Sequence, residues 1–216
     1  VEKLLSDHYL LLLKEKERLD IERKMMLGSI TSLITALEAR DHYTRGHSEA
    51  VSMFITEMAS RMCFSPDDIE TLGIAGKLHD LGKIGVPDSI LLKQGKLSKK
   101  EFELIKQHPI VGVNILGAIP SLERAIPAIR HHHERFDGTG YPDGLKENHI
   151  PLDARILAIA AAYAAMTTER PYAMKKTRQQ ALLELQHNAG TQFDPELVDR
   201  FIATQQKTAA AAGAAE

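Results

Sequence analysis

The stretch HHHERFDGTGYPDG, residues 131–144, decides how the rest of the chain is interpreted. It places three histidines in a row, follows them with Glu134 and then enters a glycine-rich turn. Three adjacent imidazoles are poor material for an apolar core, and the run lies in the middle of the chain, which argues against an affinity tag. A metal site is the sharper interpretation, because histidine is the commonest metal ligand in proteins. That interpretation requires further ligands elsewhere in the sequence.

Candidate partners for these histidines occur at three other places. The segment LHDLGKIG sets His79 and Asp80 side by side at the expected end of a helix, which Gly82 can terminate. RDHYTRGHSEAV places a histidine at the start of a helix, and IKQHPIVG places one before a helix-disrupting proline. Imidazoles with a carboxylate suit iron, manganese, zinc or nickel, and the lack of cysteine ligands argues against a structural zinc finger. The candidate ligands of a dinuclear site are His47, His79, Asp80, His108, His132 and His133.

The composition is that of an ordinary globular domain. The chain has 216 residues, of which 44% are hydrophobic and 26% charged, and its net charge is -2. It lacks the basic excess of a DNA-binding surface and any apolar run that approaches a membrane span, so we expect neither DNA nor a membrane as a partner. The single cysteine, Cys63, excludes an internal disulfide and suits a reducing compartment, from which we expect a cytoplasmic location.

Helix signals dominate the middle of the chain. SPDD, residues 65–68, combines an N-cap serine, a first-turn proline and an acidic third residue. Capping boxes are expected at 98–101 and 177–180, and another helix opens at 194–195. Residues 83–93, KIGVPDSILLK, are compatible with a short hairpin or an irregular loop, and no stretch shows several clean alternating strands. We predict an all-α domain.

The two ends of the chain differ from this middle part. Residues 1–27 are charged, lack proline and carry one apolar row with a period of seven and a second row that an arginine interrupts. We expect a connector helix that pairs two chains or leads from an upstream domain; the alternative is a solvated helix packed on its own domain. Because the sequence begins inside this helix, we expect a longer parent protein. Residues 206–216 form a low-complexity tail, which leaves 28–205 as the main domain.

The order of these motifs resembles the HD-GYP family, the bacterial cyclic di-GMP phosphodiesterases. HDLGK at 79–83 followed by HHERFDGTGYP at 132–142 carries the resemblance, which extends from ALEARDHYTRGH to GTQFDPELV. It implies an HD-type helical bundle, which agrees with the all-α domain of about seven to nine helices and the N-terminal connector helix that the residues themselves predict. It also implies a signalling hydrolase that opens cyclic di-GMP to linear pGpG, and in some members continues to GMP, at a dinuclear metal centre.

The resemblance implies a role for each candidate ligand. One metal would be held by His47 and His79, and Asp80 would bridge it to the second metal. The second metal would be completed by three further histidines, His108, His132 and His133. Iron and manganese are the favoured transition metals, with zinc and nickel as alternatives.

The resemblance also implies the contacts with substrate and partners. Lys83 would touch the scissile phosphate or assist the leaving oxygen, and Arg170 would grip a ligand phosphate. The loop formed by Gly140, Tyr141 and Pro142 would shape the pocket and is linked to GGDEF-type partner domains. An upstream sensory or receiver domain and a homodimer are further expected partners.

The sequence departs from the family pattern at the helix ILAIAAAYAAMTTERPY. Ala161 and Ala164 stand at two positions that are usually aspartate, and the first of these aspartates would be a ligand of the first metal. Ala173 replaces a phosphate-binding Arg or Lys, and Tyr43 replaces a carboxylate found in members with a third metal, which implies a ceiling of two metals. We therefore expect impaired activity from this chain. One alternative is a non-catalytic module that binds metal and cyclic dinucleotide, and a further one is an HD phosphohydrolase acting on another nucleotide.

Three residues near the histidines have two interpretations each. Tyr141 either stacks on a guanine or packs within its own loop. Asp137 either hydrogen-bonds a metal-binding histidine or fixes its own turn. Glu134 either supports the ligands or is solvated.

Overall fold

The structure is a computed structural model that describes residues 2–40, 46–168 and 175–213. Helix α1 (Glu2–Arg40) is followed by nine further α-helices within this part of the chain. They are α2 (His47–Arg61), α3 (Pro66–Leu78), α4 (Asp88–Leu91), α5 (Lys99–Ile105), α6 (His108–Leu116), α7 (Ile126–His131), α8 (Leu152–Thr167), α9 (Arg178–His187) and α10 (Pro195–Gly213). Short 3-10 helices occur at η1 (Leu81–Gly85), η2 (Pro120–Ala125) and η3 (Glu147–His149). The described residues contain no strand, and the prediction of an all-α fold is confirmed.

The predicted helix starts are formed by the expected capping interactions. Ser65 accepts a hydrogen bond from the N–H of Asp68 at 3.2 Å, and both capping boxes, at Ser98 and at Thr177, are complete. The prediction of a short hairpin or irregular loop over residues 83–93 is wrong. This segment contains η1 and α4, and Pro87 is the N-cap of α4. Helix α10 continues to Gly213, so most of the low-complexity tail is helical.

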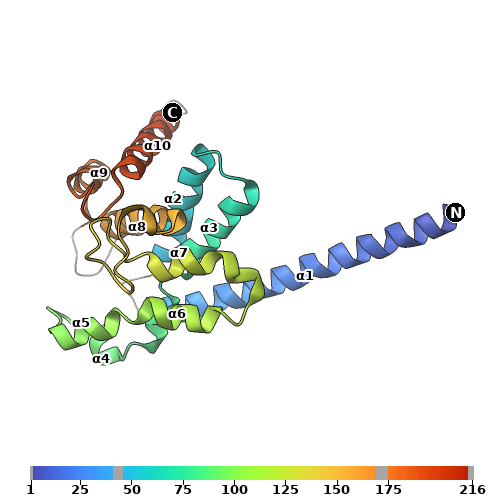
Figure 1. The fold of residues 1–216 in the computed structure, drawn as a ribbon, viewed down its shortest axis with the longest axis horizontal. Coiled ribbons are helices and arrows are strands. Elements are labelled where there is room, and N and C mark those ends of the chain that lie inside the picture. Colours follow the sequence, from blue (N-terminus) through green and yellow to red (C-terminus); the bar gives the residue numbers. More distant parts are fainter. Residues whose placement is uncertain (1, 41–45, 169–174, 214–216) are drawn as a thin grey trace.

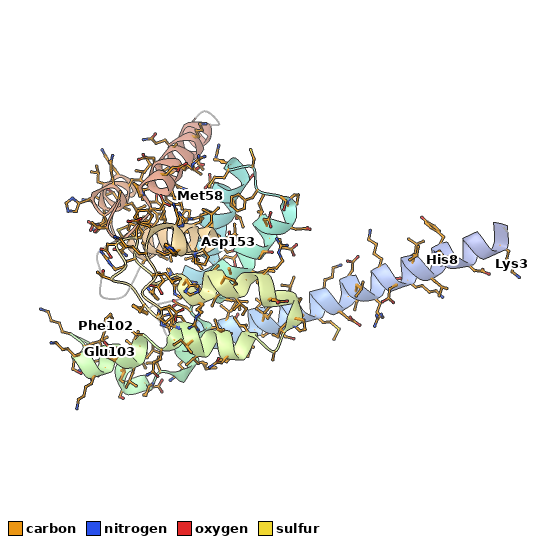
Figure 2. The ribbon with its side chains drawn as sticks, in the orientation of Figure 1. Lys3, His8, Met58, Phe102, Glu103 and Asp153 are labelled. Carbon is orange, nitrogen blue, oxygen red and sulfur yellow. The ribbon has the colours of Figure 1, made fainter. Side chains whose placement is uncertain are left out.

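Helix α1 leaves the bundle as a long, straight extension (Figure 1). Its first half projects away from the other helices, with Lys3 and His8 far from the core (Figure 2). Its last part is packed on the domain, where three buried side chains are spaced three or four residues apart: Ile30, Ile34 and Leu37. The helix is unbroken between residues 27 and 28, and the domain boundary placed there stays a prediction.

Helices α2 and α3 are packed at close range because α3 carries glycines on the shared face. A Cβ atom on Gly76 would lie 3.0 Å from the Cα of Ser52 in α2. The two helices are antiparallel neighbours, so this contact brings the start of α2 beside the end of α3. Helix α8 is central to the bundle and has buried residues along its length, including Ile156, Leu157 and Ile159.

A second close approach joins η1 to the start of α6. A Cβ atom on Gly82 would lie 1.8 Å from the carbonyl oxygen of His108, so only glycine fits there. The expectation that Gly82 terminates the preceding helix is wrong, because α3 already ends at Leu78. Pro109 lies in the first turn of α6 and does not disrupt it, since the amide hydrogen that proline lacks has no partner within a helix at that position.

Candidate metal centre

All six predicted ligands lie together, and each is supplied by the end of a helix. Histidines begin α2 and α6, a third follows α3, and an aspartate caps the start of η1. Two more follow the last turn of α7. Five of the six are buried, with exposed fractions of 1–6%: His47, His79, Asp80, His108 and His132.

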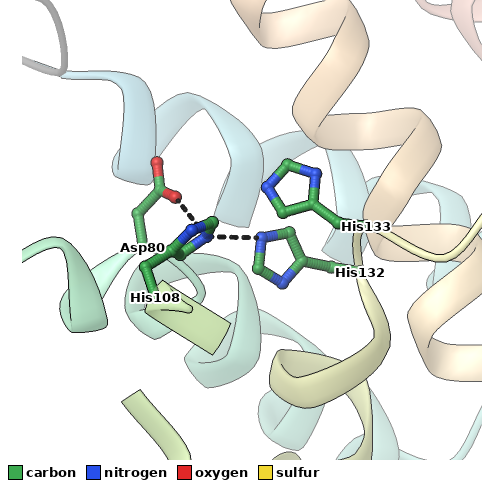
Figure 3. A group of neighbouring side chains, drawn as sticks. All are labelled: Asp80, His108, His132 and His133. Carbon is green, nitrogen blue, oxygen red and sulfur yellow. Dashed lines mark hydrogen bonds and ion pairs between the residues drawn. The ribbon is translucent and has the colours of Figure 1, made fainter. Parts of the chain in front are cut away.

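The six residues form two groups that share one carboxylate. In the larger group, one ligand atom from each residue lies within 4.8 Å of the others, and its members are Asp80, His108, His132 and His133. Figure 3 shows these four side chains converging, with 3.4 Å between the Nε2 atoms of His108 and His132. The smaller group meets the same criterion with His47, His79 and Asp80.

Asp80 presents a different oxygen to each group. Its Oδ2 lies 3.5 Å from Nε2 of His79, whereas its Oδ1 lies 3.4 Å from Nε2 of His108. A carboxylate placed in this way can bridge two metal ions. Lys83 adds a cation on the same side, with its Nζ donating to Oδ2 at 2.7 Å.

The backbone fixes which nitrogen of three histidines faces the centre. Nδ1 of His79, His108 and His132 lies 2.7–2.8 Å from the carbonyl oxygen of the residue three positions earlier. A carbonyl oxygen only accepts hydrogen bonds, so Nδ1 carries the proton and donates it. The lone pair is therefore left on Nε2, which faces the cluster. This arrangement, in which the second ring nitrogen is held by a backbone carbonyl, is the usual support of a metal-binding histidine.

The charge states also suit a metal. Burial lowers the pKa of His108 to about 4 and that of His133 to about 3, so both imidazoles are neutral and able to coordinate at pH 7. Burial opposes ionisation of Asp80, but the Lys83 ammonium and the adjacent imidazoles outweigh it and hold the pKa of Asp80 well below its usual range. Neutral nitrogen donors converging on a carboxylate fit a transition metal, and we conclude that the residues present suit the dinuclear site implied by the sequence.

Ala161 and Ala164 have different surroundings. A cavity of about 220 Å³ is lined by residues of both groups, and Ala161 lines it together with His47 and His79 of the smaller group. Ala164 is fully buried in the hydrophobic core. A carboxylate at position 161 would thus face the metal site, whereas one at position 164 would enter an apolar environment.

The cavity has two polar lining residues that the sequence analysis did not identify. Arg135 lies inside the HHHERFDG motif, where its charge was a visible signal. Gln192 comes from the connection between α9 and α10, and its segment is joined to the histidine loop by a hydrogen bond from Phe136 N to Gln192 O at 3.2 Å. No local pattern identifies this glutamine.

The loop from Gly140 to Pro142 is packed directly on the histidine segment. A Cβ atom on Gly140 would lie 2.3 Å from Arg135 N and 2.5 Å from Glu134 Cα, so glycine is required for this approach. The Tyr141 ring stacks on the His133 ring with 4.8 Å between centroids, and burial raises the pKa of Tyr141. Tyr141 is thus packed on the histidine segment, and stacking on a guanine stays a prediction.

The other open interpretations resolve as follows. Asp137 fixes its own turn, because its Oδ1 accepts hydrogen bonds from both the N–H and the hydroxyl of Thr139. Glu134 is buried and accepts two backbone hydrogen bonds, so the solvated interpretation is wrong. Three residues given roles above lie outside the described part of the chain: Arg170, Ala173 and Tyr43.

The chain is similar to known proteins. Residues 1–197 match the family model described as HD domain. The chain is 37% identical over 208 residues to a cyclic di-GMP phosphodiesterase of Thermotoga maritima. The aligned segment covers 95% of this chain and 56% of that protein. It is 38% identical over 176 residues to the cyclic di-GMP phosphodiesterase response regulator RpfG of Xanthomonas campestris pv. campestris, with coverages of 81% and 47%. The chain thus spans about half the length of these relatives.

A solved structure supports the fold. A cyclic GMP-AMP specific phosphodiesterase of V. cholerae aligns with a TM-score of 0.64 at 18% identity, over 82% of this chain and 48% of that one. No helix in the described residues has the length and apolarity needed to cross a membrane. The family-model match, the two relatives above 30% identity and the histidine and GYP motifs lead to one assignment: the chain belongs to the HD-GYP family of HD-domain proteins.

Proposed function

We propose that this domain is a metal-dependent phosphodiesterase that hydrolyses cyclic di-GMP to linear pGpG, with GMP as the product of a second cut. The observation that carries the proposal is the position of Asp80, whose two oxygens face two separate histidine groups beside a cavity. The names of the two curated relatives support the choice of cyclic di-GMP as substrate.

The two groups would hold one transition ion each. Imidazole nitrogens and a carboxylate without a thiolate suit iron or manganese, with zinc or nickel as alternatives. When bound, two such ions polarise the phosphoryl oxygens and lower the pKa of the attacking water. The contribution of the chain is to fix their separation through Asp80 and to supply neutral imidazoles, which leave the positive charge of the site uncancelled.

Cationic side chains would bind the phosphate. Lys83 lines the cavity and is already oriented toward the site by its contact with Asp80 at 2.7 Å. As a compact charge on a flexible stem, it can follow a phosphoryl oxygen during bond cleavage. Arg135 lies at the same cavity, held by Asp137 and Thr139, and Arg170 is the further phosphate ligand that the family resemblance suggests.

The alanine at position 161 is the reason to propose reduced activity. The smaller group contains two histidines and the shared carboxylate, one protein ligand fewer than the larger group, and Ala161 lines the cavity that both groups border. The same observation favours the alternative, a module that binds metal and cyclic dinucleotide without hydrolysis. The larger group is complete in either case.

We also propose partners and a location for this domain. The exposed leucines of α1, such as Leu12 and Leu19, support a homodimer or contact with an upstream sensory or receiver domain. The loop containing Gly140, Tyr141 and Pro142 is the proposed contact for a GGDEF-type domain. We propose a cytoplasmic location, where cyclic di-GMP is available to the site.

Chromatography of the products separates the two candidate functions. Protein loaded anaerobically with Mn²⁺ or Fe²⁺ is incubated with cyclic di-GMP and, in parallel, with cyclic GMP-AMP. We expect slow formation of pGpG, abolished in Asp80→Asn and unchanged in Asp67→Asn, whose side chain is exposed far from the cavity. Saturable binding of cyclic di-GMP by the loaded protein without any product would instead establish the non-catalytic module.

A further inference from the structure

We infer that Tyr141 and Glu134 are positioning residues that hold the imidazole of His133 in place, and that the GYP loop therefore acts on the metal centre from outside its ligand set. The inference rests on the proposed function to the extent that His133 is a metal ligand. It concerns how this ligand is oriented and not which substrate is cleaved.

The orientation of His133 is fixed differently from that of its neighbours. His79, His108 and His132 each donate from Nδ1 to a backbone carbonyl. Among the hydrogen bonds of the described residues, none involves the His133 ring, although this ring belongs to the larger ligand group. Its plane is therefore set by ring contacts: the ligands His132 and His108 lie at 4.1 and 5.0 Å between centroids, and Tyr141 supplies the contact from outside the ligand set.

Tyr141 contacts His133 through both its ring and its backbone. The two rings lie 4.8 Å apart between centroids, with an angle of 22° between their planes, which is a stacked geometry. The N–H of Tyr141 also donates to the carbonyl oxygen of His133 at 3.2 Å. The ring is thus held parallel to the imidazole by a residue whose own backbone is fixed to the same histidine.

The surroundings of Tyr141 leave little room for a second stacking partner. The Nζ atom of Lys106 lies over the ring at 5.7 Å from its centroid, and the Phe102 ring approaches at 6.4 Å in an edge-to-face geometry. Tyr141 is not among the residues that line the cavity beside His79 and Lys83. A guanine base would have to displace one of these contacts in order to stack on it.

Glu134 fastens the other end of the loop to the ligand segment. Its side chain is fully buried, and its two oxygens accept the N–H groups of Asp143 at 2.7 Å and Leu145 at 3.1 Å. A buried carboxylate is stable only with such partners, and here both of these donors are backbone groups that follow the GYP residues. Because Glu134 directly follows His133 in sequence, the clamp fixes the loop relative to the imidazole it supports.

The test measures metal affinity in the full chain by competition between Zn²⁺ and a chromophoric chelator. Partners of metal-binding histidines change affinity by about 10–100-fold, so Tyr141→Ala and Tyr141→Leu should each weaken the tighter ion by that factor. Tyr141→Phe keeps the stacked ring and should stay within about threefold of the parent. The d–d absorption of bound Co²⁺ should change in the first two variants and not in the third.

Glu134→Gln should weaken the same ion, because an amide has one acceptor oxygen and leaves one backbone N–H facing its NH₂ group. Glu123→Gln, at an exposed position, is the matched control and should not differ from the parent. If Glu134 acts through the Tyr141 loop, the double variant Glu134→Gln/Tyr141→Leu should be no weaker than the more affected single variant.

Parental Zn²⁺ affinity in both Tyr141→Ala and Tyr141→Leu would overturn the inference. If these variants also had a raised KM for cyclic di-GMP, the tyrosine would be a base-stacking residue instead. Failure of the parent chain to bind any ion would refute the proposed function, which is a separate result. The leucine variant keeps an apolar side chain of similar bulk, so the comparison with phenylalanine remains available if the alanine variant is unstable.

Discussion

The Oδ1 oxygen of Asp80 lies 3.4 Å from Nε2 of His108, while its other oxygen lies 3.5 Å from Nε2 of His79. One carboxylate is therefore common to both ligand groups. Its removal should affect two ions, whereas loss of any single histidine should affect one.

The first prediction concerns this shared carboxylate. Asp80→Asn keeps the shape of the side chain but removes its charge and one acceptor, so metal content should fall from about two ions per chain to well below one. Elemental analysis after dialysis measures this, with Asp67→Asn as control. Loss of one ion alone would mean that Asp80 serves only one group.

The second prediction separates the two groups by affinity. The larger group has four protein ligands and the smaller has three, so the larger should retain its ion under conditions that strip the smaller. His47→Ala should leave about one tightly held ion, and His108→Ala should remove it. If both variants retained the same number of tightly bound ions, the assignment of His47 and His108 to different sites would be contradicted.

The third prediction uses the two alanines of α8. Ala161 lines the cavity beside His47 and His79, so Ala161→Asp should add a ligand to the smaller group and raise hydrolysis of cyclic di-GMP by about tenfold or more. Helix propensity falls by only a few tenths of a kcal/mol, which folding should tolerate. The rate is measured as linear product per minute with Mn²⁺ in excess. Equal rates for fully loaded parent and variant would show that another step limits this chain.

Ala164→Asp is the matched comparison at the neighbouring position. Ala164 is fully buried in the core, where an unpaired carboxylate costs on the order of 3–5 kcal/mol. We expect a lower free energy of unfolding in urea and no gain in rate. A rate gain equal to that of Ala161→Asp would mean that both side chains reach the metal.

The fourth prediction concerns α1. Leu12 and Leu19 are 56% and 53% exposed, whereas Met26 of the same seven-residue row packs against the domain. Deletion of residues 1–25 should therefore remove an association surface and leave the domain folded. Light scattering should show a dimer for the full chain and a monomer for the deletion, with unchanged helical circular dichroism per residue of the remaining domain. A full chain that is already monomeric would contradict the proposal that α1 pairs two chains.

The convergence of the six candidate ligands could be predicted from the sequence because their signals are local. A histidine next to an aspartate, a histidine before a helix and a histidine pair before a glycine-rich turn each lie at a helix end. The family resemblance supplied the assignment of these residues to two groups. The fold class followed from capping patterns for the same reason.

The features that could not be predicted from the sequence depend on contacts between segments far apart in the chain. The sequence pattern predicts that Gly82 terminates a helix. Glycine is needed at this position for another reason, because the backbone of His108 lies against it in the packed structure. The neighbours of Tyr141 include Phe102 of α5 and Lys106 at its C-cap, which no pattern around the GYP motif indicates. The different environments of Ala161 and Ala164 likewise follow from how α8 is oriented in the bundle.

The central claim is that two ions held through Asp80 hydrolyse cyclic di-GMP, and a metal titration tests it most directly. Metal-free protein is titrated anaerobically with Mn²⁺, and pGpG formation is measured at each step for the parent and for Ala161→Asp. The account predicts little product at one equivalent, when the larger group fills, and a rise to a plateau as about two equivalents are bound. A full rate at one equivalent, or product formed without metal, would contradict it.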